Sequence, residues 1–134
     1  MYFKLLFILV YMTVISSPMM AKKLSLTKLL EFNKITQEKN VVGTVEGFDS
    51  KRYKIKVKSN QRLNIKMESD NVYFNIYSPY KNRDDDALFV GKSEGKHFNG
   101  VLLKDGRYMI RVYLKTDEAE KDIKRIFEMH IELI

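Results

Sequence analysis

The chain has 134 residues, of which 45% are hydrophobic, and a formal net charge of +7. This length suits one domain with one hydrophobic core. Cysteine is absent, which excludes disulfides, thiolate zinc sites and thiol nucleophiles. The positive charge favours acidic partners, although an ordinary lysine-rich surface has the same composition. Nucleic acid is not expected, because tryptophan is absent and the tyrosines lie in strand-like runs that form no stacking platform.

The first 21 residues have the pattern of a signal peptide that is cleaved on export. Lys4 provides a positive start, residues 5–15 form an apolar run, and Ala21 is a small residue at the expected cleavage point. The run is shorter than the roughly 20 apolar residues that span a bilayer, and an uncleaved membrane anchor is the alternative. We therefore expect a signal peptide at residues 1–21, a binding domain at residues 22–134, and a periplasmic or secreted protein.

Residues 22–40 are compatible with two structures. Their apolar residues have a partial helical spacing, and Thr27 is available as an N-cap. Local propensity therefore predicts a helix. The apolar residues within 29–32, followed by polar ones, also fit a short first strand.

From Val41 onward, apolar and polar residues alternate with a period of two, as they do in strands with one buried face. Turn residues separate these runs at intervals of about eight to twelve residues, which is typical of a sandwich or barrel. The predicted strands cover residues 41–46, 53–58, 63–68, 73–77, 88–90, 101–103, 108–114 and 127–134. The sequence thus predicts an all-β domain of antiparallel strands.

The connections between these strands include one hairpin signal and two recognition loops. Asp105 and Gly106 suit a tight primed turn between two paired strands. The segments 78–86 and 91–100 are rich in polar and turn residues, and rigid scaffolds often carry recognition in such loops. Residues 115–124 are charged and predict an exposed loop or a short helical turn.

No catalytic or metal-binding motif is apparent, so we expect neither an enzyme nor a cofactor. His97, expected in a loop, and His130, on the outward side of the last strand, have no metal-ligand spacing around them. Three aspartates at residues 84–86 lack the spacing of a calcium loop. A row of cations at alternate positions of one strand, from Arg52 to Lys58, either faces an acidic partner or keeps that face soluble.

The chain resembles the periplasmic inhibitors of invertebrate-type lysozyme, a family of small exported bacterial β-sandwich proteins. The matching segments are residues 43–47, 53–63, 73–76, 87–91, 98–102, 105–108 and 110–114. The resemblance runs from about Thr27 to Ile134, and it implies a β-sandwich in which residues 29–32 form a strand. It also implies a non-enzymatic protein whose protruding loop enters the lysozyme cleft and hydrogen-bonds the catalytic acids.

The expected contact is the loop at residues 91–100, with Ser93, Asn99 and Gly100 touching the partner. The family often has a Ser-Gly pair in such a loop, where this sequence has Asn99 and Gly100. Two further pairs complete the predicted site: Arg111 and Tyr113 support the loop, and Tyr80 and Lys81 are second-rank contacts.

The expected partner is a lysozyme, and an acidic one suits the basic chain best. The alternative is a carbohydrate- or envelope-binding module without inhibitory activity, for which an exposed row of Tyr73, Tyr77 and Tyr113 is the expected sign. Exposed strand edges leave a homodimer open.

Overall fold

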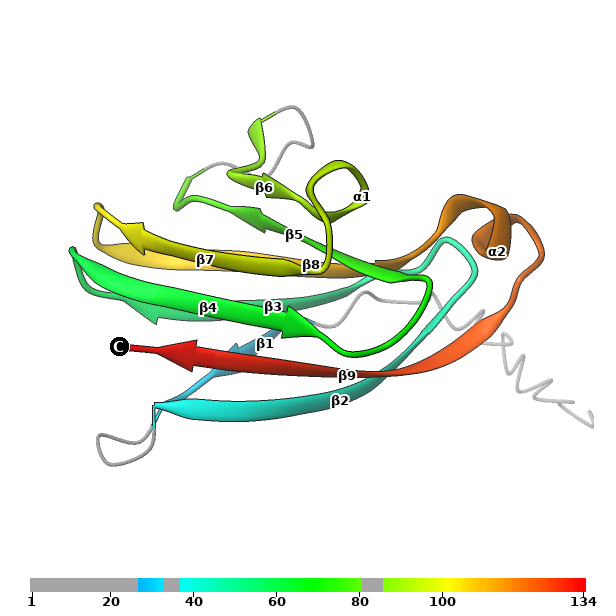
Figure 1. Ribbon diagram of the computed structural model, residues 1–134, viewed down its shortest axis with the longest axis horizontal. Coiled ribbons are helices and arrows are strands. Elements are labelled where there is room, and N and C mark those ends of the chain that lie inside the picture. Colours follow the sequence, from blue (N-terminus) through cyan, green and yellow to red (C-terminus); the bar gives the residue numbers. More distant parts are fainter. Residues whose placement is uncertain (1–26, 33–36, 81–85) are drawn as a thin grey trace, which may run out of the picture.

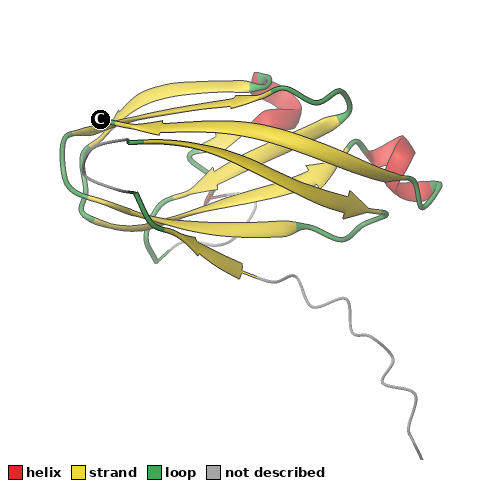
Figure 2. Cartoon of the chain, turned by 90° about the horizontal axis from the view of Figure 1, so that it is seen from below, coloured by secondary structure: helices red, strands yellow, loops and turns green. Residues whose placement is uncertain are grey.

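The computed structural model describes residues 27–32, 37–80 and 86–134, and these form two packed layers of β-strands (Figures 1 and 2). The expected signal peptide and Lys81 lie outside the described residues. The strands are β1 (Thr27–Leu30), β2 (Glu38–Glu46), β3 (Lys51–Val57), β4 (Gln61–Met67), β5 (Val72–Tyr77), β6 (Phe89–Val90), β7 (His97–Leu102), β8 (Gly106–Leu114) and β9 (Lys124–Leu133). Two short helical turns are α1 (Gly91–Glu94) and α2 (Thr116–Glu120).

Among the described strands, sheet A has the order β1-β3-β8-β5-β6 and sheet B the order β2-β9-β4-β7. The pairs are antiparallel except β1 with β3, which is parallel. The predicted all-β sandwich is confirmed. The local prediction of a helix near Thr27 is wrong where the chain is described, because pairing with β3 recruits residues 27–30 as an edge strand.

The hydrophobic core lies between the two sheets and follows the predicted alternation. In β3, β4 and the part of β9 from Phe127 onward, buried apolar residues alternate with half-buried or exposed polar ones. Burying one face of each strand fixes its register, because a one-residue slip would turn every core side chain outward. The largest fully buried side chains, at most 2% exposed, include Phe74, Tyr77, Phe127, Ile55 and Leu63.

Most successive strands alternate between the two sheets, so the expected hairpin at Asp105 is wrong. The strand before it, β7, pairs with β4 in sheet B, and the strand after it, β8, pairs with β3 and β5 in sheet A. The Asp105 carboxylate accepts a hydrogen bond from the Ser59 backbone N–H in the β3–β4 connection. Gly106 has φ +140, and a Cβ there would lie 2.6 Å from Cγ of Pro79. Gly106 therefore lies where the chain passes from sheet B to sheet A, packed closely against the loop that contains Pro79.

A half-buried ion pair holds α2 against the end of the sandwich. The Glu118 side chain accepts hydrogen bonds from Arg125 Nε at 2.6 Å and from Asn71 Nδ2 at 2.8 Å. The hydrogen bond from Arg125 is the main reason that the pKa of Glu118 is lowered. The charged form of this carboxylate is therefore the one that the folded protein stabilises.

We expect Glu118→Gln to make the free energy of unfolding less dependent on pH in the acidic range. Because the pKa of Glu118 is lowered in the folded protein, the unfolded chain takes up the proton first as the pH falls. The stabilisation of the folded state by the Glu118 carboxylate is therefore present above the ordinary pKa of 4.5 and is lost as the pH falls below that value. Urea unfolding measured from pH 7 to pH 3 should show a shallower loss of stability for the variant. The control is Glu120→Gln, an exposed glutamate of the same helix; equal pH profiles for the wild type and Glu118→Gln would contradict the assignment.

Candidate functional site

The α1 turn, residues 91–95, is a single helical turn that stands on sheet A directly after β6. The Gly95 N–H donates to the Gly91 carbonyl at 2.9 Å, and the Val90 N–H donates to the Glu94 carboxylate at 2.7 Å. Gly95 then leaves the turn with φ +109, a conformation that favours glycine. Only Gly91 of the helix is buried, and Lys92, Ser93 and Glu94 are exposed. The turn thus presents its side chains, Ser93 among them, to solvent.

The base of the turn lies unusually close to the backbone of β5. A Cβ at Gly91 would lie 2.5 Å from the Phe74 carbonyl oxygen and 3.0 Å from its nitrogen. No flexible side chain is available there to move aside, so a residue with a side chain would push the turn off the sheet. Glycine at this position lets the α1 turn seat directly on β5.

A polar cluster of Asn75, Tyr77, Arg111 and Tyr113 lies beneath the α1 turn, on the face of sheet A that points away from the core. The Gly91 N–H donates to Asn75 Oδ1 at 3.2 Å, and the Lys92 N–H donates to the Tyr113 hydroxyl at 3.3 Å. That hydroxyl in turn donates to Asn75 Oδ1 at 2.6 Å. Two backbone amides of the turn are therefore held by side chains of β5 and β8.

Tyr77 and Arg111, the other two members of the polar cluster, hold Asn75 and Tyr113 in place. Asn75 Nδ2 donates to the Tyr77 hydroxyl at 3.2 Å, and Arg111 lies over the Tyr113 ring at 5.0 Å from its centroid. Asn75 is 4% exposed and Tyr77 is fully buried. Buried polar groups of this kind stiffen a structure when they are satisfied. The polar cluster gives the exposed turn a rigid base.

A cavity of about 280 Å³ opens beside the α1 turn and extends toward α2. Its wall includes Phe48, a residue that is 74% exposed, together with Lys92, Arg111 and Tyr113. Lys92 Nζ lies 3.2 Å from Thr116 Oγ1 at the rim and connects the turn to α2. The recess is basic and aromatic, and among the described residues around it we find no paired carboxylates suited to acid–base chemistry.

The structure brings together only part of the predicted site. Ser93 is exposed on the α1 turn, the Tyr113 hydroxyl accepts from the backbone of the adjacent Lys92, and Arg111 lies over the Tyr113 ring. Asn99 and Gly100 are not in a loop, because β7 begins at His97 and pairs with β4. Asn99 instead lies on the outward face of sheet B, where its Oδ1 accepts from Arg62 at 3.0 Å. His97 is likewise in this strand, against the expected loop.

Two further predictions concern exposed aromatic rings. Tyr80 is fully exposed with φ +70, at the edge of the described residues. Tyr77 is fully buried, and Tyr73 and Tyr113 are half-buried with ring centroids 6.2 Å apart. The expected exposed row of three tyrosines is therefore not formed.

Sequence reasoning missed Asn75 as part of the site and placed Tyr77 in an exposed row instead of beneath the α1 turn. Alternation places Asn75 on the outward side of β5, where a polar residue is ordinarily solvated. A signal was present, because Asn75 stands between two outward-facing tyrosines, Tyr73 and Tyr77, in a short and otherwise apolar strand. A covered outward face is one explanation of that pattern.

Comparison with solved structures finds the same fold in two periplasmic inhibitors of g-type lysozyme. The inhibitor from Aeromonas hydrophila has a TM-score of 0.73 and 23% identity, covering 81% of this chain and 96% of that chain. The inhibitor from Salmonella Typhimurium has a TM-score of 0.66 and 16% identity, covering 81% and 97%.

The pre-peptidase C-terminal domain of collagenase from Bacillus anthracis is more distantly similar, with a TM-score of 0.50, 15% identity, and coverage of 82% and 96%. No family model matches the sequence, and no curated protein matches it. At these identities the comparisons establish the fold.

The solved inhibitors act on g-type lysozyme, whereas the sequence resemblance pointed to the invertebrate type. Within the described part of the chain, no helix has the length and apolar character needed to cross a membrane.

Proposed function

We propose that the protein is an exported, periplasmic or secreted inhibitor of lysozyme that inserts the α1 turn into the enzyme's active-site cleft. One observation carries this proposal: Ser93 is exposed at the tip of a turn whose backbone is fixed from below by Asn75 and Tyr113. The fold shared with two inhibitors of g-type lysozyme supports it. The protein itself performs no chemistry in this proposal.

The rigid base of the turn is what makes it suitable for blocking a cleft. A loop that is ordered before binding loses little conformational entropy when it is buried, so more of the contact energy appears as affinity. Hydrogen bonds to Asn75 and Tyr113 provide that order in the free protein. The exposed hydroxyl of Ser93 is then presented in one position.

The charge around the turn suits the chemistry of a glycoside hydrolase. Such enzymes place two carboxyl groups on either side of the bond that they cleave. The α1 turn offers the exposed Lys92 and the Ser93 hydroxyl, with Arg111 beneath them, and the carboxylate of its Glu94 is bonded to the Val90 N–H. The outward face of sheet A adds Arg52, Lys54, Lys56 and Arg107. An acidic cleft attracts this surface, whereas a strongly cationic lysozyme slows its approach.

The direct test is to follow cell-wall lysis by goose-type, invertebrate-type and chicken-type lysozymes with and without the purified protein. We expect micromolar protein to slow at least one of them, with the g-type enzyme as the first choice because the solved inhibitors of the same fold act on it. Inhibition should weaken between 0.05 and 0.5 M salt, roughly, as charge steering is screened. Unchanged lysis by all three enzymes would refute the proposal.

A further inference from the structure

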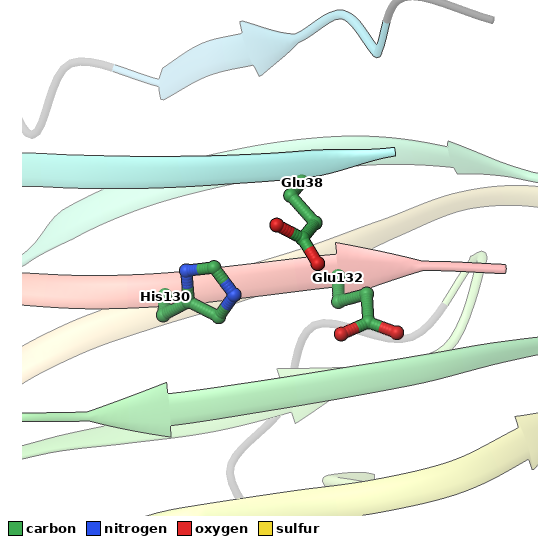
Figure 3. Close-up of side chains that lie close together, drawn as sticks. All are labelled: Glu38, His130 and Glu132. Carbon is green, nitrogen blue, oxygen red and sulfur yellow. The ribbon is translucent and has the colours of Figure 1, made fainter. Parts of the chain in front are cut away.

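Three potential metal ligands meet on the outward face of sheet B, away from the α1 turn. Glu38 begins β2, and His130 and Glu132 lie near the end of β9. Their neighbours Met129 and Ile131 are buried in the core, so His130 and Glu132 project to the outside. Figure 3 shows the two carboxylates and the imidazole gathered beside the ends of these strands. One ligand atom from each residue lies within 4.8 Å of the other two.

The strand register explains why these groups meet. Glu38 is directly opposite Glu132, and Asn40 is directly opposite His130, in the antiparallel β2–β9 pair. Like charges directly opposite each other destabilise a sheet. Among the described residues, no ion pair involves Glu38 or Glu132, and Lys66, opposite His130 on β4, is paired with Glu68 at 3.5 Å. The two carboxylates are thus available to a cation.

The imidazole of His130 is already oriented. Its Nδ1 lies 2.7 Å from Asn40 Oδ1. Because an amide oxygen only accepts, this contact in a neutral ring places the proton on Nδ1 and leaves the lone pair of Nε2 for a metal ion. Histidines that bind metals commonly donate their second ring nitrogen to an oxygen in this way, which fixes the tautomer and the ring. In Figure 3 one ring nitrogen faces the two carboxylates.

We propose that Glu38, His130 and Glu132 bind a divalent transition-metal ion of the Zn²⁺ class, with water completing the coordination. Imidazole together with carboxylate favours Zn²⁺, Cu²⁺ or Ni²⁺ over Mg²⁺ and Ca²⁺, which prefer oxygen ligands. Metal–ligand bonds of about 2.0–2.2 Å require the three ligand atoms to draw closer together, and the exposed Glu38 and half-buried Glu132 side chains can rotate to do so. The ion would neutralise the two facing carboxylates and link β2 to β9 through ligands from both strands.

The test uses Zn²⁺ as the probe, added to chelator-treated protein that carries no histidine tag. The chain offers a matched control, because His97 is its other histidine, also lies on an outward strand face and also contacts an asparagine, Asn64, at 2.6 Å. Zn²⁺ is expected to shift the imidazole NMR signals of His130 and leave those of His97 unchanged. It should also raise the Tm, since a ligand that binds only the folded state stabilises it.

Variants then separate a built site from general surface binding. His130→Gln and Glu132→Gln should each weaken Zn²⁺ affinity by at least about tenfold in calorimetry, whereas His97→Gln should retain it. Mg²⁺ at the same concentration should shift neither histidine. Equal Zn²⁺ affinity in the wild type and His130→Gln, equal shifts of both histidines, or no Zn²⁺ binding at millimolar concentration would overturn the proposal. The result is independent of lysozyme inhibition, because the α1 turn lies on the other sheet.

Discussion

Replacing Asn75 with alanine is expected to lower the free energy of unfolding by about 2–4 kcal/mol. Asn75 is nearly completely buried, and its amide oxygen accepts from both the Tyr113 hydroxyl and the Gly91 N–H. Alanine leaves these donors, and the Tyr77 hydroxyl, without that partner inside the protein. An unsatisfied buried polar group costs about 1–3 kcal/mol, and the lost side-chain volume adds to it.

Chemical denaturation of the variant against the wild type measures this loss, and Asn99→Ala is the matched control. Asn99 is also in a strand and also accepts a side-chain hydrogen bond, but it is exposed. Its substitution should change the unfolding free energy by no more than about 0.5 kcal/mol. If Asn75→Ala were as mild as Asn99→Ala, the polar cluster would not be the support that we assign to it.

The strands were predictable because burial acts on them one face at a time. In β3 and β9 the apolar residues that the sequence places at alternate positions are the ones that the core buries. This pattern requires no knowledge of which strands are neighbours. It therefore predicted a sandwich or barrel of antiparallel strands without giving their order, and the family resemblance favoured the sandwich.

Strand partnership was not predictable, and the errors in the candidate site follow from it. Asp105 and Gly106 have the composition of a hairpin turn, yet the strands on either side of them join different sheets. Asn99 and Gly100 have the composition of a loop, yet pairing with β4 extends β7 back to His97. Local sequence specifies turn and loop propensity, whereas the hydrogen-bonding partner comes from a strand far away in the chain.

The support of the α1 turn was partly predictable. Arg111 interrupts an apolar strand and Tyr113 shares its face, which made both candidates for holding a loop from below. Asn75 was missed because its burial depends on what covers the outward face of sheet A. Here the α1 turn seats on β5, and its amides reach Asn75 and Tyr113. The α1 turn covers Asn75 through tertiary packing, and the alternation of apolar and polar residues in the sequence does not indicate such packing.

Replacing Ser93 with arginine is expected to weaken lysozyme inhibition at least about 100-fold while leaving the protein folded. Ser93 is exposed, so the longer side chain should fit in the free protein. In a cleft that closely fits the turn, the same side chain has no room, and misfit at the centre of an interface costs more than at its rim. The matched control is Ser59→Arg, which adds the same charge at an exposed serine in the β3–β4 connection.

The most direct test of the α1 turn as the inhibitory element is the inhibition constant of the wild type, Ser93→Arg and Ser59→Arg against the lysozyme that the wild type inhibits best. Our account predicts that Ser93→Arg loses inhibition, that Ser59→Arg retains it, and that all three proteins unfold at similar temperatures. Equal inhibition by the wild type and Ser93→Arg would show that another surface contacts the enzyme.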